Sequence, residues 1–175
     1  MATYIVKSLD QLTNVIITKI EKLLDTVAEK VKERIDEELE RYYDDYDPAW
    51  TSFTRKYFYN RTYQLRNACK ISPINKGLNE MSVEIYIDVN SLNYSTPGAD
   101  PWKTVVAANS GLHGGWVINN GKADRQIPWE DLNDDSNYGN VRIWDTPMEE
   151  LLDSRKLRDI FIDEAKKLGL NIIAK

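Results

Sequence analysis

The chain has 175 residues and a mass of 20.3 kDa, which lets one domain bury roughly 70% of the surface that the unfolded chain exposes. Apolar residues make up 42%, with ten Tyr, five Trp and three Phe, and this composition argues against a disordered protein. The 23 basic and 28 acidic residues give a net charge of −5. That balance disfavours nucleic-acid binding as the main activity, because neutralisation of phosphates by Lys and Arg drives such binding.

The single cysteine, Cys69, excludes an internal disulfide and a metal site of the C-x-x-C type. No stretch approaches the ~20 apolar residues that a membrane span needs, and residues 1–10 lack the apolar core of a signal peptide. We therefore expect synthesis in the cytoplasm of a cell and no membrane partner.

Residues 8–43 carry the pattern of one long amphipathic helix. Ser8 and Gln11 have the spacing of a capping box at its start. At 1.5 Å per residue the helix is about 54 Å long, more than the roughly 30–40 Å diameter of a compact domain of this size. It therefore either bends around its own core or projects toward a partner. Its apolar residues recur at steps of three or four: Leu12, Ile16, Ile20, Leu23, Val27, Val31, Ile35, Leu39 and Tyr42.

An aromatic loop is expected at residues 44–64. Residues 42–63 hold six Tyr, two Phe and one Trp, a density typical of the centre of a protein interface. The alternative is a loop that folds back on the core of its own chain.

The remaining residues, 65–175, are expected to form a small sheet with a short helix and a C-terminal helix. Residues 81–89 alternate between apolar and polar side chains, as a half-buried strand does. A preceding strand is predicted at 65–71, with a turn at 75–77. Asp100 and Pro101 predict the start of a helix that Gly111 ends.

Residues 111–140 are rich in Gly, Asn and Asp, which favours loops or a long hairpin. Strands are predicted at 141–144 and 171–174. Thr146, followed by Pro147 and Glu149, predicts the cap of a last helix that Gly169 ends. Its expected buried side consists of Leu151, Leu152, Ile160, Phe161, Ala165 and Leu168.

The order of these elements predicts an α+β fold in a single domain, residues 1–175. We expect the long N-terminal helix and the C-terminal helix to pack on one face of a small, mostly antiparallel β-sheet.

Candidate metal sites are incomplete. Asp131, Asn133, Asp135 and Asn137 alternate like the first ligands of a calcium loop, but Ser136 replaces the required Gly and Arg142 replaces the bidentate Glu. Asp44, Asp45 and Asp47 crowd one turn, whereas a magnesium site draws its ligands from separate elements. We expect no metal and no cofactor.

Candidate catalytic residues are equally few. His113 is the only histidine and has no partner at a diagnostic spacing. Cys69 lies in a predicted strand, where a small core residue is expected rather than a nucleophile. No nucleophile elbow, phosphate loop or zinc-protease motif occurs. The expectation is that the chain is not an enzyme and has no catalytic residues.

Two short segments carry a resemblance to a known family. Tyr43–Pro48 has the form Y-x-x-Y-x-P, and Tyr59–Leu65 has the form Y-x-R-T-x-x-L. Both follow a long N-terminal helix, and a hairpin, a short helix ending in G-L-H-G and a C-terminal helix come after them. In this order they resemble the tail-completion, or head–tail joining, proteins of long-tailed bacteriophages.

The resemblance implies a structural protein of the virion neck without enzymatic activity. Such proteins form homo-oligomeric, commonly hexameric rings between the connector or stopper proteins of the DNA-filled head and the terminator or tube proteins of the tail. DNA passes through the ring without specific binding. Ring subunits contact their neighbours through two different surfaces, which would use the long helix and an extended loop.

The chain departs from the family pattern in one place, where Ala49–Phe58 lengthen the spacing between the two motifs. By the resemblance, Tyr59, Arg61 and Thr62 are expected to shape the loop, with Arg61 bonding carbonyls or carboxylates. The residues expected to contact neighbouring subunits are Tyr46, Trp50, Phe53, Tyr57 and Phe58.

Two other functions stay open. One is a tail terminator, also a ring of α+β subunits, which caps the tail tube. The other is a carbohydrate-binding module outside the virion, which requires exposed Trp side chains. Its candidates are Trp102, Trp116, Trp129 and Trp144, for which burial in the core is the alternative.

Overall fold

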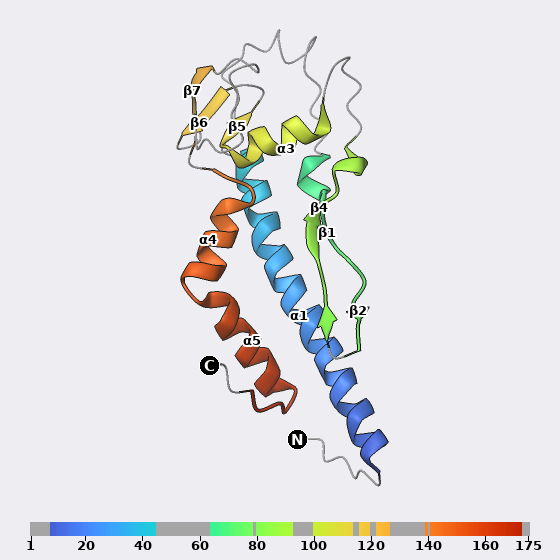
Figure 1. The fold of residues 1–175 in the computed structure, drawn as a ribbon. Helices are drawn as coiled ribbons and strands as arrows, with labels where there is room; N and C mark the ends of the chain where they lie inside the picture. The colour runs from blue at the N-terminus through green and yellow to red at the C-terminus, as the bar shows by residue number, and fades with distance from the viewer. Residues whose placement is uncertain are drawn as a thin grey trace.

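The longest element of the computed structural model is one helix, α1 (Leu9–Asp44), which extends from the lower end of the view toward the strands drawn in yellow near the top (Figure 1). The structure describes residues 8–44, 64–78, 80–92, 100–113, 116–119, 122–126, 139 and 141–172. The α+β class is confirmed: a long N-terminal helix and C-terminal helical segments accompany small antiparallel sheets. The predictions for residues 45–63 concern a part of the chain that lies outside the described residues.

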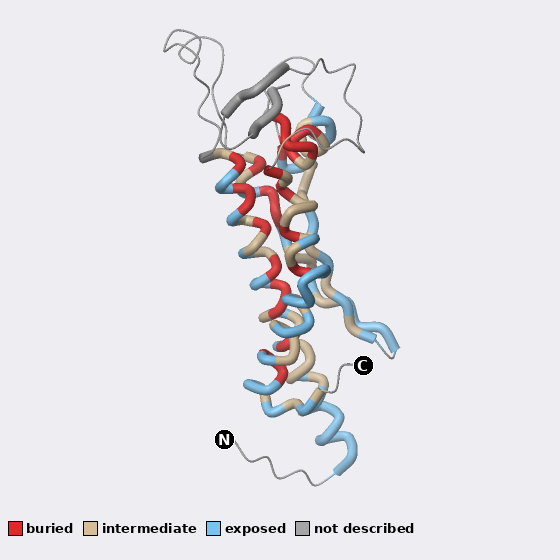
Figure 2. Tube along the Cα trace, turned by 90° about the vertical axis from the view of Figure 1, so that its left-hand side faces the viewer, coloured by how far each residue is buried: buried red, intermediate tan, exposed pale blue. Residues whose placement is uncertain are grey.

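The start of α1 agrees with the predicted cap, since the Ser8 hydroxyl accepts a hydrogen bond from the Gln11 N–H at 3.3 Å. The apolar stripe of the helix is buried from Leu23 to Tyr42. Toward the N-terminus the same stripe is no longer buried, since Leu12 is 42% and Ile16 is 40% exposed. Of the two expected outcomes for the long helix, projection is therefore the one observed (Figure 2).

Two short antiparallel pairs of strands lie beside α1. β1 (Cys69–Ile71) pairs with β4 (Ile85–Ile87), and β2 (Asn75–Lys76) pairs with β3 (Met81–Ser82). Residues 81–87 alternate between half-buried and exposed side chains, as predicted, but the expected strand 81–89 is divided into β3 and β4, and Val89 already belongs to a 3₁₀ turn.

Two other boundaries in this region were also predicted wrongly. The strand expected at 65–71 begins only at Cys69, because Leu65–Asn67 form a 3₁₀ turn, η1, that buries Leu65 against α1. The turn expected at 75–77 lies further along the chain, where the Gly77 N–H donates to the Glu80 carbonyl at 2.9 Å. A second 3₁₀ turn, η2 (Val89–Ser91), follows β4.

The next helix, α3 (Pro101–Asn109), forms as predicted. The Asp100 carboxylate accepts hydrogen bonds from the backbone N–H groups of Trp102 and Lys103, at 3.0 and 3.3 Å. The helix ends at Asn109, and Gly111, which has a φ of +76°, turns the chain away from the helix axis. β5 (Leu112–His113), β6 (Trp116–Asn119) and β7 (Lys122–Gln126) then form an antiparallel sheet, in agreement with the predicted hairpin.

The C-terminal region corrects three predictions. Residues 141–144 form no strand, because Val141 and Ile143 are buried without pairing to another strand. The last helix is divided into α4 (Asp145–Asp153) and α5 (Lys156–Lys167) by Arg155, which has a φ of +60°. Leu152 is 59% exposed instead of buried.

The end of this region is partly as predicted. Gly169, with a φ of +70°, follows α5. Asn171 and Ile172 are not in a strand, and the rest of the predicted strand 171–174 lies beyond the described residues.

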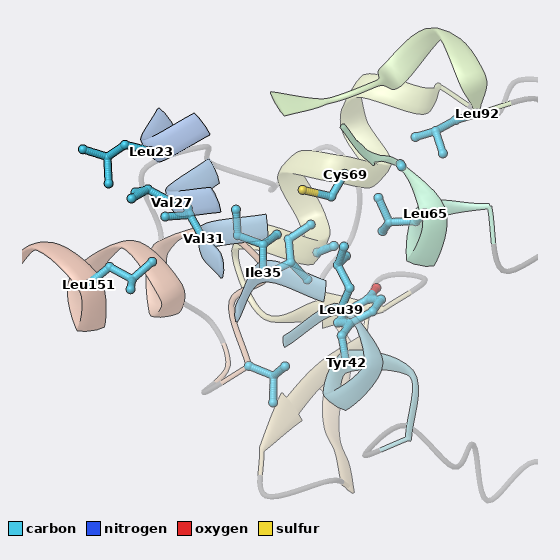
Figure 3. Close-up of a cluster of buried hydrophobic side chains, with 14 of the residues drawn as sticks. Leu23, Val27, Val31, Ile35, Leu39, Tyr42, Leu65, Cys69, Leu92 and Leu151 are labelled. Atoms are coloured by element: carbon cyan, nitrogen blue, oxygen red, sulfur yellow. The ribbon is translucent and has the colours of Figure 1, made fainter. Parts of the chain in front are cut away.

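One hydrophobic cluster joins these elements (Figure 3). The central stretch of α1 packs against η1, β1 and β4 and also against α4 and α5. The Tyr42 hydroxyl donates to the Leu112 carbonyl at 2.7 Å, which links the end of α1 to β5. The buried members include Leu23, Val27, Val31, Ile35, Leu39, Tyr42, Leu65, Cys69, Leu92, Ala108, Val141, Ile143, Leu151 and Ala165.

Candidate interaction surfaces

The predicted interface and loop residues fall together in residues 45–63, outside the described part of the chain: Tyr46, Trp50, Phe53, Tyr57, Phe58, Tyr59, Arg61 and Thr62. The two ends of that segment are described. It leaves α1 at Asp44 and returns at Gln64, just before η1. Because Arg66 Nη2 lies 2.7 Å from Glu40 Oε1, both ends of the segment are held at the same end of α1.

An apolar surface lies at the opposite end of α1. Leu9 is 77% exposed, and Leu12 and Ile16 are each about two-fifths exposed; we call these three residues the α1 tip. The hairpin of β2 and β3 projects nearby and leaves Leu78 98% exposed in its turn (Figure 2). Lys76 Nζ, 2.6 Å from Glu21 Oε1, ties this hairpin to α1.

The sequence pattern did not reveal this exposed end. Helical periodicity identifies the apolar face of α1 but not the point at which its covering elements stop. Here α5 ends at Lys167, and a Cβ at Gly169 would lie 3.6 Å from Lys19 Nζ. The stripe N-terminal to Lys19 therefore continues beyond the C-terminal helices.

A row of acidic side chains follows another face of α1. Glu29, Glu33, Glu37 and Glu40 are all exposed and recur at helical spacing; we call them the acidic stripe. They line a shallow groove together with Lys32 and Asp36. Lys32 and Asp36 form an ion pair, and this hydrogen bond raises the pKa of Lys32. Of the six side chains that line the groove, five are acidic, and two of these also face a guanidinium: Glu40 pairs with Arg66 at 2.7 Å, and Glu37 Oε2 lies 3.8 Å from Arg34 Nη1.

A network of ion pairs fastens α1 to α4 and α5. Glu38 is buried, with 1% of its surface exposed, and its two carboxylate oxygens lie 3.2 Å from Arg34 Nη2 and 3.4 Å from Arg41 Nη1. Arg34 Nε also donates to Glu150 Oε2 at 2.7 Å, and Glu150 pairs with Lys156. Hydrogen bonds from Lys156 and Arg34 lower the pKa of Glu150.

Sequence reasoning missed this network, although the spacing of Arg34, Glu38 and Arg41 on one helix was a usable signal. A second pairing secures α5, since Glu164 Oε1 lies 3.1 Å from Lys30 Nζ and 2.7 Å from Lys167 Nζ. The bonds from Lys167 and Lys30 lower the pKa of Glu164. Carboxyl groups held ionised in this way clamp helices together and are poorly suited to donate a proton at neutral pH.

Of the two candidate catalytic residues, the structure describes the side chain of Cys69 but not that of His113. Cys69 is buried, and burial raises the pKa of its thiol to about 11, so at neutral pH the thiol stays protonated as a core residue. His113 lies in β5, and its side chain is outside the described residues.

The candidate metal ligands are mostly outside the described residues. This applies to Asp131–Asn137, to Asp45 and Asp47, and to the side chain of Asp44. Arg142 pairs with Glu149 at 2.6 Å and with Asp145 at 3.4 Å. Within the described ranges, no group of three or more His, Cys, Asp or Glu side chains is arranged to hold a metal ion.

The tryptophans proposed for carbohydrate binding differ in exposure. Trp102, at the start of α3, is 59% exposed, so burial in the core is wrong for this residue. Trp144 is half-buried and packs against the core. The side chains of Trp116 and Trp129 lie outside the described residues.

Comparisons with protein-family models, with curated proteins and with solved structures find no match to this chain. None of the helices in the described ranges combines the length and the apolar character that crossing a bilayer requires. The function is therefore inferred from the residues themselves and from the surfaces described above.

Proposed function

We propose that this chain is a structural subunit of the neck of a long-tailed bacteriophage, where it joins the DNA-filled head to the tail tube. The family resemblance of Tyr43–Pro48 and Tyr59–Leu65 suggests the assembly. The structural observation that supports it best is the projection of α1 beyond its core, which leaves the α1 tip exposed. Contiguous exposed apolar residues of this kind mark contact sites for other proteins.

In this proposal the subunit forms a homo-oligomeric ring between connector or stopper proteins and terminator or tube proteins. Each subunit presents one surface to the preceding neighbour and a different surface to the next, as head-to-tail contacts require. The acidic stripe is the face that suits the channel of the ring, because its charge repels DNA phosphates and lets the DNA slide. Basic residues lining the channel would contradict this part of the proposal.

The experiment that tests the proposal is negative-stain microscopy of lysates from a phage that lacks the gene for this chain. Filled heads and finished tails lying apart are the expected result, and restoring the gene should restore joined particles. Intact particles without the gene would overturn the proposal. Tails of uncontrolled length would instead favour the tail terminator, the nearest alternative.

One observation favours a different function, a carbohydrate-binding module. Trp102 is exposed enough to stack on a sugar ring. A fluorescence titration of the chain with sugars, comparing it with Trp102→Ala, tests this alternative. A saturable change that the variant loses would support it, and an unchanged spectrum would exclude binding of those sugars at Trp102.

A further inference from the structure

The junction between α4 and α5 is a bend that the local sequence does not encode. No Gly or Pro occurs between Pro147 and Gly169, although helices commonly end at a Gly because it adopts a positive φ without strain. Arg155 takes this role with a φ of +60°, which is unfavourable for a residue that has a Cβ atom. In the described ranges it is the only residue other than Gly with a positive φ. The bend is therefore imposed by contacts outside the junction itself.

The start of α5 is also poorly capped. Arg155 occupies the N-cap position, but its side chain makes no capping hydrogen bond, and Arg is not among the preferred N-cap residues. In a continuous helix, the first N–H groups of α5 would instead bond to carbonyls of α4, four residues earlier. The local interactions thus favour one straight helix over residues 145–167, about 35 Å long at 1.5 Å per residue.

One contact that holds α5 in its bent position spans the junction. Lys156 forms an ion pair with Glu150, six residues earlier in the chain. On a straight helix, residues three or four apart are neighbours, whereas residues six apart lie on different faces. This ion pair therefore exists only while the helix is bent.

The other contacts that hold α5 are made with α1, along which it packs (Figure 1). Glu164 Oε1 lies 3.1 Å from Lys30 Nζ, and the adjacent Ala165 is fully buried. On the stretch of α1 before Lys30, Leu23 and Val27 are only 1% and 8% exposed. An α5 that left its position would uncover apolar surface on both helices, so it needs an equivalent surface elsewhere.

A second copy of the chain offers α5 an identical surface. We propose that α5 exchanges between two copies: residues 145–167 straighten into one helix, and the α5 of each copy packs on the α1 of the other. The contact of Lys30 with Glu164 is then made between copies and the strain at Arg155 is released, whereas the ion pair of Lys156 with Glu150 is lost. Reciprocal exchange leaves neither α1 uncovered and is a low-cost route to a dimer.

Zero-length cross-linking tests the exchange on the unaltered chain. Equal amounts of ¹⁵N-labelled and unlabelled chain are unfolded in urea, refolded together at high concentration and treated with a carbodiimide, which joins contacting amines and carboxylates. Monomer and dimer fractions are then separated and digested with trypsin. The link between Lys30 and Glu164 joins peptide 23–32 to peptide 159–166. We expect this link to carry one isotope label in the monomer and mixed labels in the dimer.

Two results of this experiment would overturn the inference. A dimer whose links between Lys30 and Glu164 all carry a single label would mean that the copies associate through another surface. A chain that stays monomeric at its highest attainable concentration after refolding would mean that α5 does not exchange.

Variants at the junction test the bend by light scattering after size-exclusion chromatography. Arg155→Gly should raise the dissociation constant of the dimer by about tenfold or more, because Gly adopts a positive φ freely and is a poor helix former. Lys156→Ala should lower it about threefold, because it removes a weak, exposed ion pair that only the bent form makes. The two variants alter neighbouring residues and are expected to act in opposite directions.

Lys166→Ala is the matched control. Lys166 Nζ lies 3.4 Å from Asp163 Oδ1, three residues away on the same helix, so this pair is compatible with both forms. The control should leave the dissociation constant unchanged, and circular dichroism checks that each variant stays folded. An Arg155→Gly variant that dimerises as tightly as the unaltered chain would contradict the inference.

The inference goes beyond the proposed function and is tested separately from it. Mixed labels in a chain whose loss leaves phage particles intact would support the exchange and overturn the neck function. Separated heads and tails together with single-label links would do the reverse.

Discussion

Two glycines meet where the end of α3 turns toward β5. Gly111 has a φ of +76°, and a Cβ at this position would lie 2.5 Å from the Gly139 Cα. The obstacle is backbone, held by the hydrogen bond from the Gly139 N–H to the Ser110 carbonyl at 3.1 Å, so it cannot move aside as a side chain would. We expect Gly111→Ala to lower the free energy of unfolding by more than about 2 kcal/mol, measured by urea denaturation.

Gly169→Ala is the matched control. Gly169 has a similar φ of +70°, but a Cβ there meets only Lys19 Nζ at 3.6 Å, an ordinary contact. The control should lose only the conformational term, about 1 kcal/mol. Equal losses in the two variants would mean that Gly111 and Gly139 are not in close approach.

The buried carboxylate of Glu38 gives a second prediction at the residue scale. Arg34→Met would remove the 3.2 Å contact of Arg34 with Glu38 and leave Glu38 the weaker 3.4 Å contact with Arg41. Because an underpaired buried charge is costly, we expect the free energy of unfolding to fall by about 2 kcal/mol. Lys156→Met, which breaks the exposed pairing of Glu150, should lower it by less than about 1 kcal/mol.

The double variant Arg34→Met with Glu38→Met separates charge burial from lost packing. Removing both partners also removes the buried charge, so about half of the stability lost in Arg34→Met should return. Denaturation of the single and double variants side by side gives the answer. Additive losses would show that the pairing of Arg34 with Glu38 is not what stabilises this part of α1.

At the scale of elements, the start of α4 depends on a residue from another helix. The side-chain oxygen of Asn109, at the end of α3, accepts hydrogen bonds from the backbone N–H groups of Trp144 and Asp145, both at 3.0 Å. We expect Asn109→Ala to lower the free energy of unfolding by about 1–2 kcal/mol and Asn109→Asp to retain most of it. Thr146→Ala, at the cap position that the sequence predicts, should change the free energy of unfolding by less than about 0.5 kcal/mol. A larger loss in Thr146→Ala than in Asn109→Ala would mean that Thr146 caps the helix, as the sequence predicts.

Glu150 makes the attachment of the C-terminal helices dependent on pH. Its pKa is lowered from 4.5 because Lys156 and Arg34 bond the ionised form. The stability it contributes is therefore present above pH 4.5 and is lost as the pH falls through the lowered pKa. We expect Glu150→Gln to melt at a lower temperature than the unaltered chain at pH 7, with the gap closing well below pH 4.5. Asp153→Asn, an exposed change on the same helix, should show no such gap.

Local signals explain which elements the sequence could predict. α1 and α3 carry their caps within the same segment, at Ser8 and Asp100, and α1 adds a long apolar period. Such information is contained in neighbouring residues, so both helices begin close to the predicted positions.

The elements predicted wrongly depend on distant contacts. Residues 141–144 alternate like a strand because Val141 and Ile143 face the core, but pairing requires a second strand that the alternation cannot supply. The cap of α4 comes from Asn109, 35 residues before Trp144. The candidate surfaces also depend on distant contacts. The α1 tip is exposed because α5 ends before reaching it, and Glu38 is buried because other elements pack around it.

On the scale of the whole molecule, α1 joins two regions of unequal packing. Its C-terminal half is held by the hydrophobic cluster and by the ion pairs of Arg34 and Lys30. Its N-terminal end has the exposed tip and the ion pair of Lys76 with Glu21 from the β2–β3 hairpin. Because helices shorter than about 12–15 residues are marginal in water, this end depends on propagation from the packed half.

Hydrogen exchange should therefore divide α1 in two. In the monomer we expect amides of residues 12–19 to exchange on the order of a hundredfold faster than those of residues 27–42, because the tip can open without disturbing the core. Exchange followed by mass spectrometry measures both stretches in one experiment, and peptides from α5 serve as the slow reference. Covering of the tip in an assembled ring should slow its exchange toward the core value while leaving α5 unchanged. Equal protection of both stretches in a verified monomer would mean that the projecting end is stable alone, and assembly would then have no ordering role there.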